Sequence, residues 1–206
     1  MGERMLINLS GGIDSVYCLH LMLEQGHKVL AHHIRLRNRE GREQVEYKAT
    51  QRVLQHFRSK GYSRQIKYHE TGFDYGTINY VAYDLYIWSF MTAILLTDPN
   101  TRASTRAVVI SSHLDSPFML NPEREARRRA LVRSVLGDWE PEWVFPIGDM
   151  TKKQIVQAIP NDLLNLCWWC RYPRRNKPCG RCKTCKQVTE ALREKGRSEE
   201  RPVSPQ

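Results

Sequence analysis

The stretch LINLSGGIDSVYCLHLMLEQG, residues 6–26, decides the fold of this 206-residue chain. A short apolar run stops at Ser-Gly-Gly, and an apolar pattern with helical spacing follows it. This order predicts a buried strand over residues 5–9, a glycine turn, and a helix over residues 14–25 that Gly26 caps. A strand that passes through a tight turn into a helix is the first unit of a doubly wound α/β fold.

The rest of the chain continues this alternation. Further strands are predicted at residues 29–34, 64–70, 107–112 and 143–147, and further helices at residues 41–61, 78–97 and 123–133 and after a Thr151 cap. Alternation of this kind predicts an α/β fold with a doubly wound, mainly parallel five-stranded sheet and helices on both faces.

The composition changes near Asp162, where Cys, Trp, Arg and Pro become frequent. We therefore expect three parts: an α/β domain over residues 1–160, a small metal-binding lobe with its C-terminal helix over residues 161–195, and a disordered tail over residues 196–206.

The net charge of the chain indicates which kinds of partner it favours. Lys and Arg outnumber Asp and Glu by 32 to 22, which gives a formal net charge of +10. A basic balance favours polyanions such as nucleic acid or nucleotides as partners, although the interleaved charges of residues 123–133 are also typical of a solvated helix face.

The apolar run at residues 78–97 contains Asp84 and several hydroxyl residues, so we interpret it as a buried helix and expect no membrane span. No signal-peptide pattern is visible, so the expected location is cytoplasmic.

The Ser-Gly-Gly turn is suited to holding phosphate, because ligands of open α/β sheets bind at the carboxyl ends of the strands. The two glycines let the main chain approach a ligand closely, and Ser10 and Ser15 add hydroxyl donors. The helix that follows offers unpaired N–H groups and the positive end of its dipole. Asp14 would repel an anion; it fits either a helix cap or a group oriented towards a bound Mg²⁺ ion.

Five of the six cysteines fall between residues 167 and 185. In a cytosolic protein such a cluster more often binds a metal than forms disulfides. A C-x2-C-x2-C run is formed by Cys179, Cys182 and Cys185, and four thiolates make a closed tetrahedral site for structural zinc. The fourth ligand comes from Cys170, or Cys167 and Cys170 form a rival C-x2-C pair.

The residues LSGGIDS resemble the Ser-Gly-Gly-x-Asp-Ser signature of the ATP pyrophosphatases, the PP-loop superfamily. The chain lacks the Gly-Lys-Ser/Thr of the P-loop at this turn, and it lacks the dinucleotide-binding G-x-G-x-x-G there. The resemblance implies that the loop holds the pyrophosphate of ATP, with Mg²⁺, while a substrate oxygen attacks the α-phosphate. The implied ATP-binding residues are Leu9, Ser10, Gly11, Gly12, Ile13, Asp14, Ser15, His33 and Ile34.

The cysteine spacing narrows the resemblance. A C-x8-C-G-x-C-x2-C pattern downstream of this loop is similar to that of the 7-cyano-7-deazaguanine (preQ0) synthase family. The resemblance implies one Zn²⁺ ion per chain and leaves Cys167 uninvolved. The implied zinc ligands are Cys170, Cys179, Cys182 and Cys185.

Two further positions follow from the same resemblance. FPIGDMTKKQIV, residues 145–156, is similar to the family's Pro-Leu segment and the lysine that follows it, which implies that Lys152 reaches the phosphates. Asp115, in SSHLDSP, falls near an aspartate of the family's substrate loop. With Asp14, these two make up the implied catalytic residues.

The implied reaction is an ATP-dependent ligation in queuosine or deazapurine biosynthesis. ATP adenylates 7-carboxy-7-deazaguanine, ammonia gives the amide, and a second adenylation gives the nitrile, preQ0. The resemblance also implies a homodimer. Three substrate-side motifs of the family are absent: Phe-Asp-Tyr-Gly-Gln-x-His, Pro-Gly-Arg-Asn and Ser-Gly-Tyr-Pro-Asp-Cys. ATP use therefore carries over better than the identity of the substrate.

Two alternatives stay open. In the first, the chain is a PP-loop enzyme that adenylates another substrate. That substrate is either a tRNA base, which the net charge favours, or a related deazaguanine whose reaction stops at the amide. In the second, the chain is a non-catalytic nucleotide-binding partner, which the missing substrate motifs favour.

Three other features have plainer interpretations. Cys18 has no base near it in the sequence, and we expect it to serve packing. Trp168 and Trp169 are expected to pack the small lobe rather than to stack on bases. His32 and His33 end the second predicted strand, where one of them lines the adenine pocket or simply ends the strand.

Overall fold

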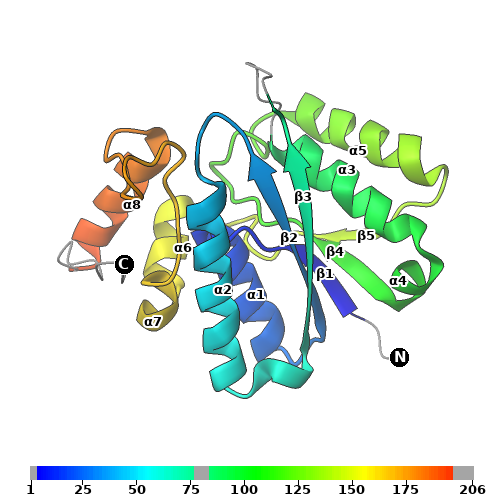
Figure 1. Cartoon of the computed structure of the whole chain (residues 1–206), viewed down its shortest axis with the longest axis horizontal. Coiled ribbons are helices and arrows are strands. Elements are labelled where there is room, and N and C mark those ends of the chain that lie inside the picture. The colour runs from blue at the N-terminus through cyan, green and yellow to red at the C-terminus, as the bar shows by residue number, and fades with distance from the viewer. Residues whose placement is uncertain (1–3, 77–83, 197–206) are drawn as a thin grey trace.

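The computed structural model describes residues 4–76 and 84–196 and shows a five-stranded sheet with helices on both faces (Figure 1). Every neighbouring pair of strands is parallel, and their order is β3-β2-β1-β4-β5. The strands are β1 Arg4–Asn8, β2 Val29–Arg37, β3 Ile66–Asp74, β4 Thr105–Val109 and β5 Glu142–Val144. The predicted α/β fold with a doubly wound sheet is therefore confirmed.

Helices cover the two faces of the sheet unequally (Figure 1). One face carries α1 Ile13–Glu24, α2 Glu43–Ser59 and α6 Lys152–Ala158, and the other carries α3 Asp84–Thr97 and α5 Pro122–Leu136, with α4 Pro99–Ser104 beside α3. The remaining described helices are the 3₁₀ turn η1 Tyr62–Arg64, the short α7 Asn161–Leu164 and the C-terminal α8 Lys183–Glu194.

The sheet separates two apolar layers, because successive side chains of a strand point to opposite faces. Ile7 of β1 lies in the main core with Val16 of α1 and Ile155 of α6. Leu6, its neighbour in the same strand, packs on the opposite face with Leu96 of α3. This alternation holds the first strand rigidly between two helix layers, and the Ser-Gly-Gly loop begins where that strand ends.

The cysteine lobe, residues 161–195, is packed on the α/β body. Leu163, Cys167, Val188 and Ala191 belong to the same main core as the first strand. The lobe therefore shares apolar packing with the sheet.

The observed elements differ from the sequence predictions in a few places. The sequence patterns do not predict α4 or α7, because six and four residues are too few to show a helical period. The predicted helix at residues 78–97 is described from Asp84 onwards; its first part lies outside the described residues, as do residues 197–206 of the predicted tail. None of the helices described is long and apolar enough to cross a membrane.

The order of the strands reverses direction beside β1. The chain moves from β1 to β2 and β3 on one side, whereas β4 and β5 lie on the other. Loops that leave β1 and β4 therefore diverge at the carboxyl edge, which is where open α/β sheets bind their ligands.

Candidate active site and metal centre

The Ser-Gly-Gly loop joins β1 to α1 and is folded by its own serines. The Ser10 hydroxyl accepts a hydrogen bond from the Gly12 N–H at 3.2 Å and lies 3.1 Å from the Ser15 hydroxyl. Ser15 Oγ in turn donates to the Gly12 carbonyl at 3.1 Å and accepts from the Ser10 N–H at 3.2 Å. These bonds make the loop a compact turn.

The N-terminus of α1 opens into this turn. Gly12 is the N-cap, and no side chain caps the helix. Among the described residues, no turn or cap hydrogen bond engages the backbone N–H groups of Ile13 and Asp14. Asp14 lies inside the first helical turn, so the interpretation of Asp14 as the cap is wrong. Free N–H groups at a helix start form a site for phosphate.

The two glycines of the loop differ in what a side chain would meet at their positions. Gly11 has a φ of 72°, and a Cβ there would lie 2.8 Å from the Thr50 nitrogen and 2.9 Å from the Glu46 carbonyl oxygen. Gly11 is therefore required for α2 to pack against the loop. Gly12 has an ordinary negative φ, and a Cβ there would lie 3.1 Å from the Ser10 hydroxyl, which can rotate away.

Asp14 and Lys152 form the central ion pair of the site. Lys152 is the first residue of α6, and its Nζ donates to both carboxylate oxygens of Asp14 at 2.5 Å. The Lys152 side chain is almost fully buried, whereas Asp14 is about one-quarter exposed. The structure thus brings together two of the residues that the sequence proposes as catalytic.

Asp115 adjoins the same pair. Its Oδ1 accepts hydrogen bonds from the Lys152 backbone N–H at 2.9 Å and from His113 Nδ1 at 2.6 Å. Burial opposes the charged form of Asp115, but these two bonds outweigh it and lower its pKa. The loop after β4 and the start of α6 therefore meet the Ser-Gly-Gly loop at the carboxyl edge.

His113 is a site residue that the sequence analysis does not identify. Its ring lies between Asp115 and Asp14, with Nε2 3.9 Å from an Asp14 oxygen. Burial lowers the pKa of His113, and the nearby Lys152 ammonium lowers it further, although both carboxylates act in the opposite sense. Its only sequence signal is a polar side chain just beyond the fourth predicted strand.

The predicted adenine-binding positions, His33 and Ile34, lie within β2. The strand does not end at these residues as expected, because it stays paired with β3 as far as Arg37. β1 pairs with β2 as far as Asn8 opposite His32, and the Leu9 N–H then donates to the His32 carbonyl. Backbone groups alternate in direction along a strand, so those of Ile34 point into the space beyond β1. No recorded backbone bond from a described loop occupies them.

The predicted ATP-binding residues whose side chains are buried can contribute only through the backbone. The ring of His33 is 1% exposed and is enclosed by the Leu9 carbonyl, 2.8 Å from Nδ1, and the Thr50 hydroxyl, 3.3 Å from the same atom. Leu9 and Ile13 have their side chains in the main core. His33 thus supports the loop from beneath.

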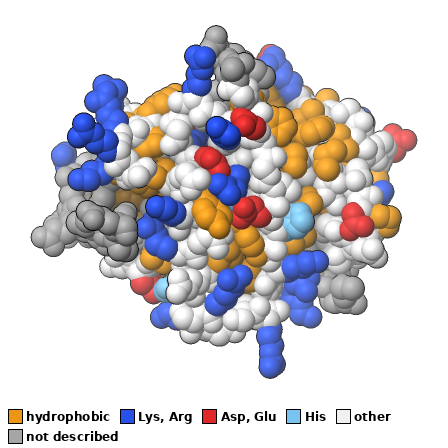
Figure 2. Space-filling model, in the orientation of Figure 1, with side chains coloured by type: hydrophobic (Ala, Val, Ile, Leu, Met, Phe, Trp, Pro, Cys, Tyr) orange, Lys and Arg blue, Asp and Glu red, His pale blue; other side chains and the backbone are white. Residues whose placement is uncertain are grey.

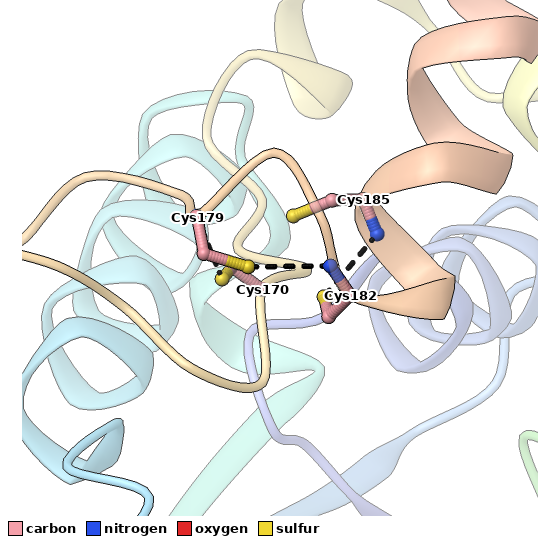
Figure 3. A group of neighbouring side chains, drawn as sticks. All are labelled: Cys170, Cys179, Cys182 and Cys185. Atoms are coloured by element: carbon pink, nitrogen blue, oxygen red, sulfur yellow. Dashed lines mark hydrogen bonds between the residues drawn. The ribbon is translucent and has the colours of Figure 1, made fainter.

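Four cysteines converge in the lobe (Figure 3). Their sulfur atoms all lie within 4.8 Å of one another and come from Cys170, Cys179, Cys182 and Cys185. Backbone N–H groups donate to three of these sulfurs: Cys179 N–H to Cys170 at 3.2 Å, Cys182 N–H to Cys179 at 3.4 Å and Cys185 N–H to Cys182 at 3.4 Å. Four thiolates at this spacing suit a tetrahedral metal ion, and the N–H donors stabilise thiolate charge.

The thiols of the cluster differ in acidity. A backbone hydrogen bond from Arg181 lowers the pKa of Cys179 to about 6, whereas burial raises the pKa of Cys170 and Cys185. Cys167 is outside the group: its thiol donates to the Leu163 carbonyl at 3.3 Å, within the main core. Cys18 is also fully buried, and burial raises the pKa of its thiol to about 12.

The lobe touches the Ser-Gly-Gly loop directly. The Trp168 N–H donates to the Gly11 carbonyl at 2.8 Å, and the Trp168 carbonyl lies beside Gly12. Its indole N–H donates to the Cys170 carbonyl at 2.8 Å, while Trp169 packs against the main core. Trp168 therefore connects the cysteine cluster to the loop.

A buried charge cluster makes a second connection. Arg42, before α2, binds Glu40, Glu46 and Asp84 at 2.6–2.8 Å. Arg171 of the lobe joins it through Asp84 at 3.1 Å and Glu40 at 3.0 Å. Burial raises the pKa of Glu46 to about 7. These contacts hold the lobe against the starts of α2 and α3.

Comparisons with known proteins agree with this geometry. Residues 3–72, which span β1 to β3, match the family described as tRNA methyl transferase HUP domain. The NMN synthetase from Francisella tularensis has a similar structure, with a TM-score of 0.53 and 12% identity over 98% of this chain and 90% of that one. The U34-tRNA thiolase NcsA from Methanococcus maripaludis, solved with its [4Fe-4S] cluster, has a TM-score of 0.55 and 15% identity over 96% of this chain and 73% of that one.

The structural comparisons show the fold of the chain. It is the fold of these two solved structures, and the Ser-Gly-Gly-x-Asp-Ser loop lies between β1 and α1 at the carboxyl edge of the sheet. No curated protein matches the chain in sequence, and the family match ends before α3.

Proposed function

We propose that the chain is an ATP-dependent ligase that adenylates 7-carboxy-7-deazaguanine and uses ammonia to form preQ0. The observation that carries the proposal is the docking of the four-cysteine lobe on the Ser-Gly-Gly loop through Trp168 and Gly11. It joins in space the two motifs whose combination resembles the preQ0 synthase family.

Different parts of the site bind different parts of the nucleotide. The N–H groups at the start of α1 and the Ser10 and Ser15 hydroxyls bind the pyrophosphate part of ATP. The free backbone edge at Ile34 binds adenine. Lys152 leaves Asp14 to contact phosphate oxygens as negative charge develops on the leaving pyrophosphate. Bound Mg²⁺ supplies further charge compensation for the phosphates.

The chemistry then proceeds in two adenylations. A carboxylate oxygen of the substrate attacks the α-phosphate, and pyrophosphate leaves. Ammonia attacks the acyl carbon, AMP leaves, and the amide forms. The amide oxygen attacks a second ATP, pyrophosphate leaves again, and loss of AMP and of the remaining amide protons gives the nitrile.

His113 is placed to handle the protons of these steps. With Asp115 ionised, Nδ1 of His113 carries the proton that Asp115 accepts, so Nε2 is left as an acceptor. A neutral imidazole can take a proton from the attacking ammonia nitrogen. Its lowered pKa keeps it neutral at neutral pH.

Zinc is the metal that we assign to the cysteine lobe. All four ligands are thiolates with no open position, which is the donor set of structural zinc rather than of catalytic zinc. A [4Fe-4S] cluster also takes four thiolates, and the thiolase with the similar fold holds one. Metal analysis and the visible absorption of the purified protein distinguish the two.

The second candidate is a PP-loop enzyme that adenylates a tRNA base. The named activity of the similar thiolase and the net charge of +10 favour it. The experiment gives the protein ATP with the carboxylate and ammonia, with tRNA, or with neither, and it measures pyrophosphate release and product mass. Production of preQ0 only with the carboxylate supports the ligase, and release only with tRNA contradicts it.

A further inference from the structure

The cysteine lobe presents a run of exposed positive charge. Residues 171–186 contain seven Lys or Arg residues and neither Asp nor Glu. Arg171 is used in the buried charge cluster. The other six are all exposed, and none has an acidic partner within the described part of the chain: Arg174, Arg175, Lys177, Arg181, Lys183 and Lys186. Lys and Arg side chains gather at the left edge of the molecule in Figure 2, where the lobe lies in Figure 1.

A tight hairpin positions three of these charges. Arg174 and Lys177 exchange two backbone hydrogen bonds of 2.9 Å, and the two residues between them form the turn. Arg175 and Asn176 have φ values of 48° and 59°, as the central residues of a type I′ turn require. We call residues 174–177 the basic hairpin.

The residue at the tip is unfavourable for the backbone. Among the described residues, Arg175 and Asn176 are the only non-glycine residues with positive φ. Asn tolerates this region, but an arginine there is strained, and glycine is the residue that such turns favour. A strained charged side chain at a fixed, exposed tip points to a role in binding.

The residues around the basic hairpin indicate which kind of polyanion it binds. Tyr172, next to the hairpin, is 54% exposed, and an exposed ring among cations is suited to stacking on an unpaired base. The chain between Trp168, which binds the Gly11 carbonyl, and the hairpin spans roughly 20 Å at most. A polynucleotide held there has an unpaired nucleotide within reach of the ATP loop.

We infer that the basic hairpin and its neighbours bind RNA through an unpaired loop segment. Proteins read RNA mainly at unpaired loops, whose bases can stack on aromatic and arginine side chains. The phosphates pair with the hairpin cations, and the base stacks on Tyr172. This inference goes beyond the proposed function and does not depend on it.

The test measures binding of a fluorescein-labelled RNA hairpin with an unpaired loop by anisotropy, at several salt concentrations and without ATP. The variant Arg175→Glu/Lys177→Glu should weaken binding tenfold or more, and the slope of log affinity against log salt should fall by about two, one for each lost phosphate contact. The matched control Arg127→Glu/Arg133→Glu makes the same charge change on α5, on the other side of the sheet, and should stay within about twofold.

A third variant separates binding from structure. Arg175→Gly relieves the positive φ, so it should keep the metal and raise the melting temperature while it weakens RNA binding several-fold. A purely structural hairpin would gain stability with no loss of affinity, and that result would overturn the inference.

Four other results would also overturn it: no binding of RNA, an equal loss in the α5 control, equal affinity for single-stranded DNA of the same sequence, or equal affinity for polyglutamate. Pyrophosphate release with the free carboxylate, measured on the same variants, reports separately on the proposed function.

Discussion

Gly11 and Gly12 are neighbours, yet the structure gives them separate tasks. A Cβ on Gly11 meets the backbone of α2, and its φ is positive, whereas a Cβ on Gly12 meets only the Ser10 hydroxyl and the edge of the Trp168 carbonyl. The pair therefore offers a test in which one variant damages packing and the other damages only the ligand site.

Gly12→Ala should fold with nearly unchanged stability and lose ATP turnover, because its methyl group occupies the space that phosphate must approach. Gly11→Ala should lower the free energy of unfolding by about 1–3 kcal/mol, since it combines backbone strain with a clash. Urea unfolding and pyrophosphate release measure the two effects. Unchanged pyrophosphate release in Gly12→Ala would count strongly against the assignment of the loop.

His113 should set the acid limb of the activity profile. Its pKa is lowered, so activity measured at a constant concentration of free ammonia should stay constant through neutral pH and fall only when the pH drops below the ordinary histidine value of about 6.5. His113→Gln should lower the ammonia-dependent step by about 10²-fold or more, while ATP–pyrophosphate exchange with the carboxylate continues.

Hydroxylamine is the control nucleophile, because it is unprotonated at neutral pH and attacks an acyl adenylate readily without a base. It should restore release of AMP in His113→Gln, with the hydroxamate as the product. If exchange is lost together with the ammonia step, His113 acts on adenylation or on folding, and its role as a base is wrong.

At the scale of the element, β2 carries two buried histidines whose charge state matters for stability. Burial lowers the pKa of His32, whose Nε2 bonds Thr71 at 2.8 Å, to about 3, and it lowers that of His33 as well. In the unfolded chain both titrate near about 6.5. Below that pH the unfolded state binds more protons, so stability is complete above about pH 6.5 and is lost as the pH falls.

We expect the free energy of unfolding to fall by roughly 1 kcal/mol per pH unit and per histidine between pH 6 and pH 5. Urea unfolding at each pH measures it. His32→Asn, which keeps a polar side chain near Thr71, should show a shallower slope. An equal slope in the variant would mean that other groups cause the acid sensitivity.

The cysteine run before α8 yields a prediction about the metal. Cys170→Ser should lose the metal and destabilise the lobe by several kcal/mol, because structural metal binding contributes folding free energy. Cys167→Ser should keep the metal, since Cys167 bonds the Leu163 carbonyl instead. Metal content and melting temperature decide the matter, and the reverse pattern would make Cys167 a ligand.

At the scale of the whole molecule, the site joins distant parts of the sequence. Asp14 and Lys152 are 138 residues apart, and the lobe reaches Gly11 through Trp168. The Ser-Gly-Gly loop therefore depends on packing from the far end of the chain.

Removing the metal should consequently weaken ATP binding, although no cysteine touches the loop. The Trp168–Gly11 hydrogen bond contributes about 1 kcal/mol to the ordering of the loop, so its loss alone should lower ATP affinity by at most about tenfold. Calorimetry on chelated and metal-restored protein measures it, with limited proteolysis to show opening of residues 161–195. Unchanged ATP affinity in the metal-free protein would show that the lobe is independent of the loop.

The amino-acid pattern alone was enough to predict the α/β class and the Ser-Gly-Gly turn between the first strand and its helix, and it carries the resemblance to the PP-loop signature. These follow from periodicity and local spacing, which act over a few residues: strand alternation, helical repeats, and three cysteines in one short run. Phosphate binding by that turn stays a prediction. The zinc ligands, the catalytic roles and the substrate stay predictions.

Only the tertiary structure decided what those local patterns could not reach. It placed Asp14 on Lys152 instead of at the helix cap, buried the ring of His33 beneath the loop, and brought His113 between Asp14 and Asp115. Such contacts depend on the order of strands in the sheet, because that order sets which loops meet at the carboxyl edge. A local pattern along the chain does not predict which distant segments will come into contact in the fold.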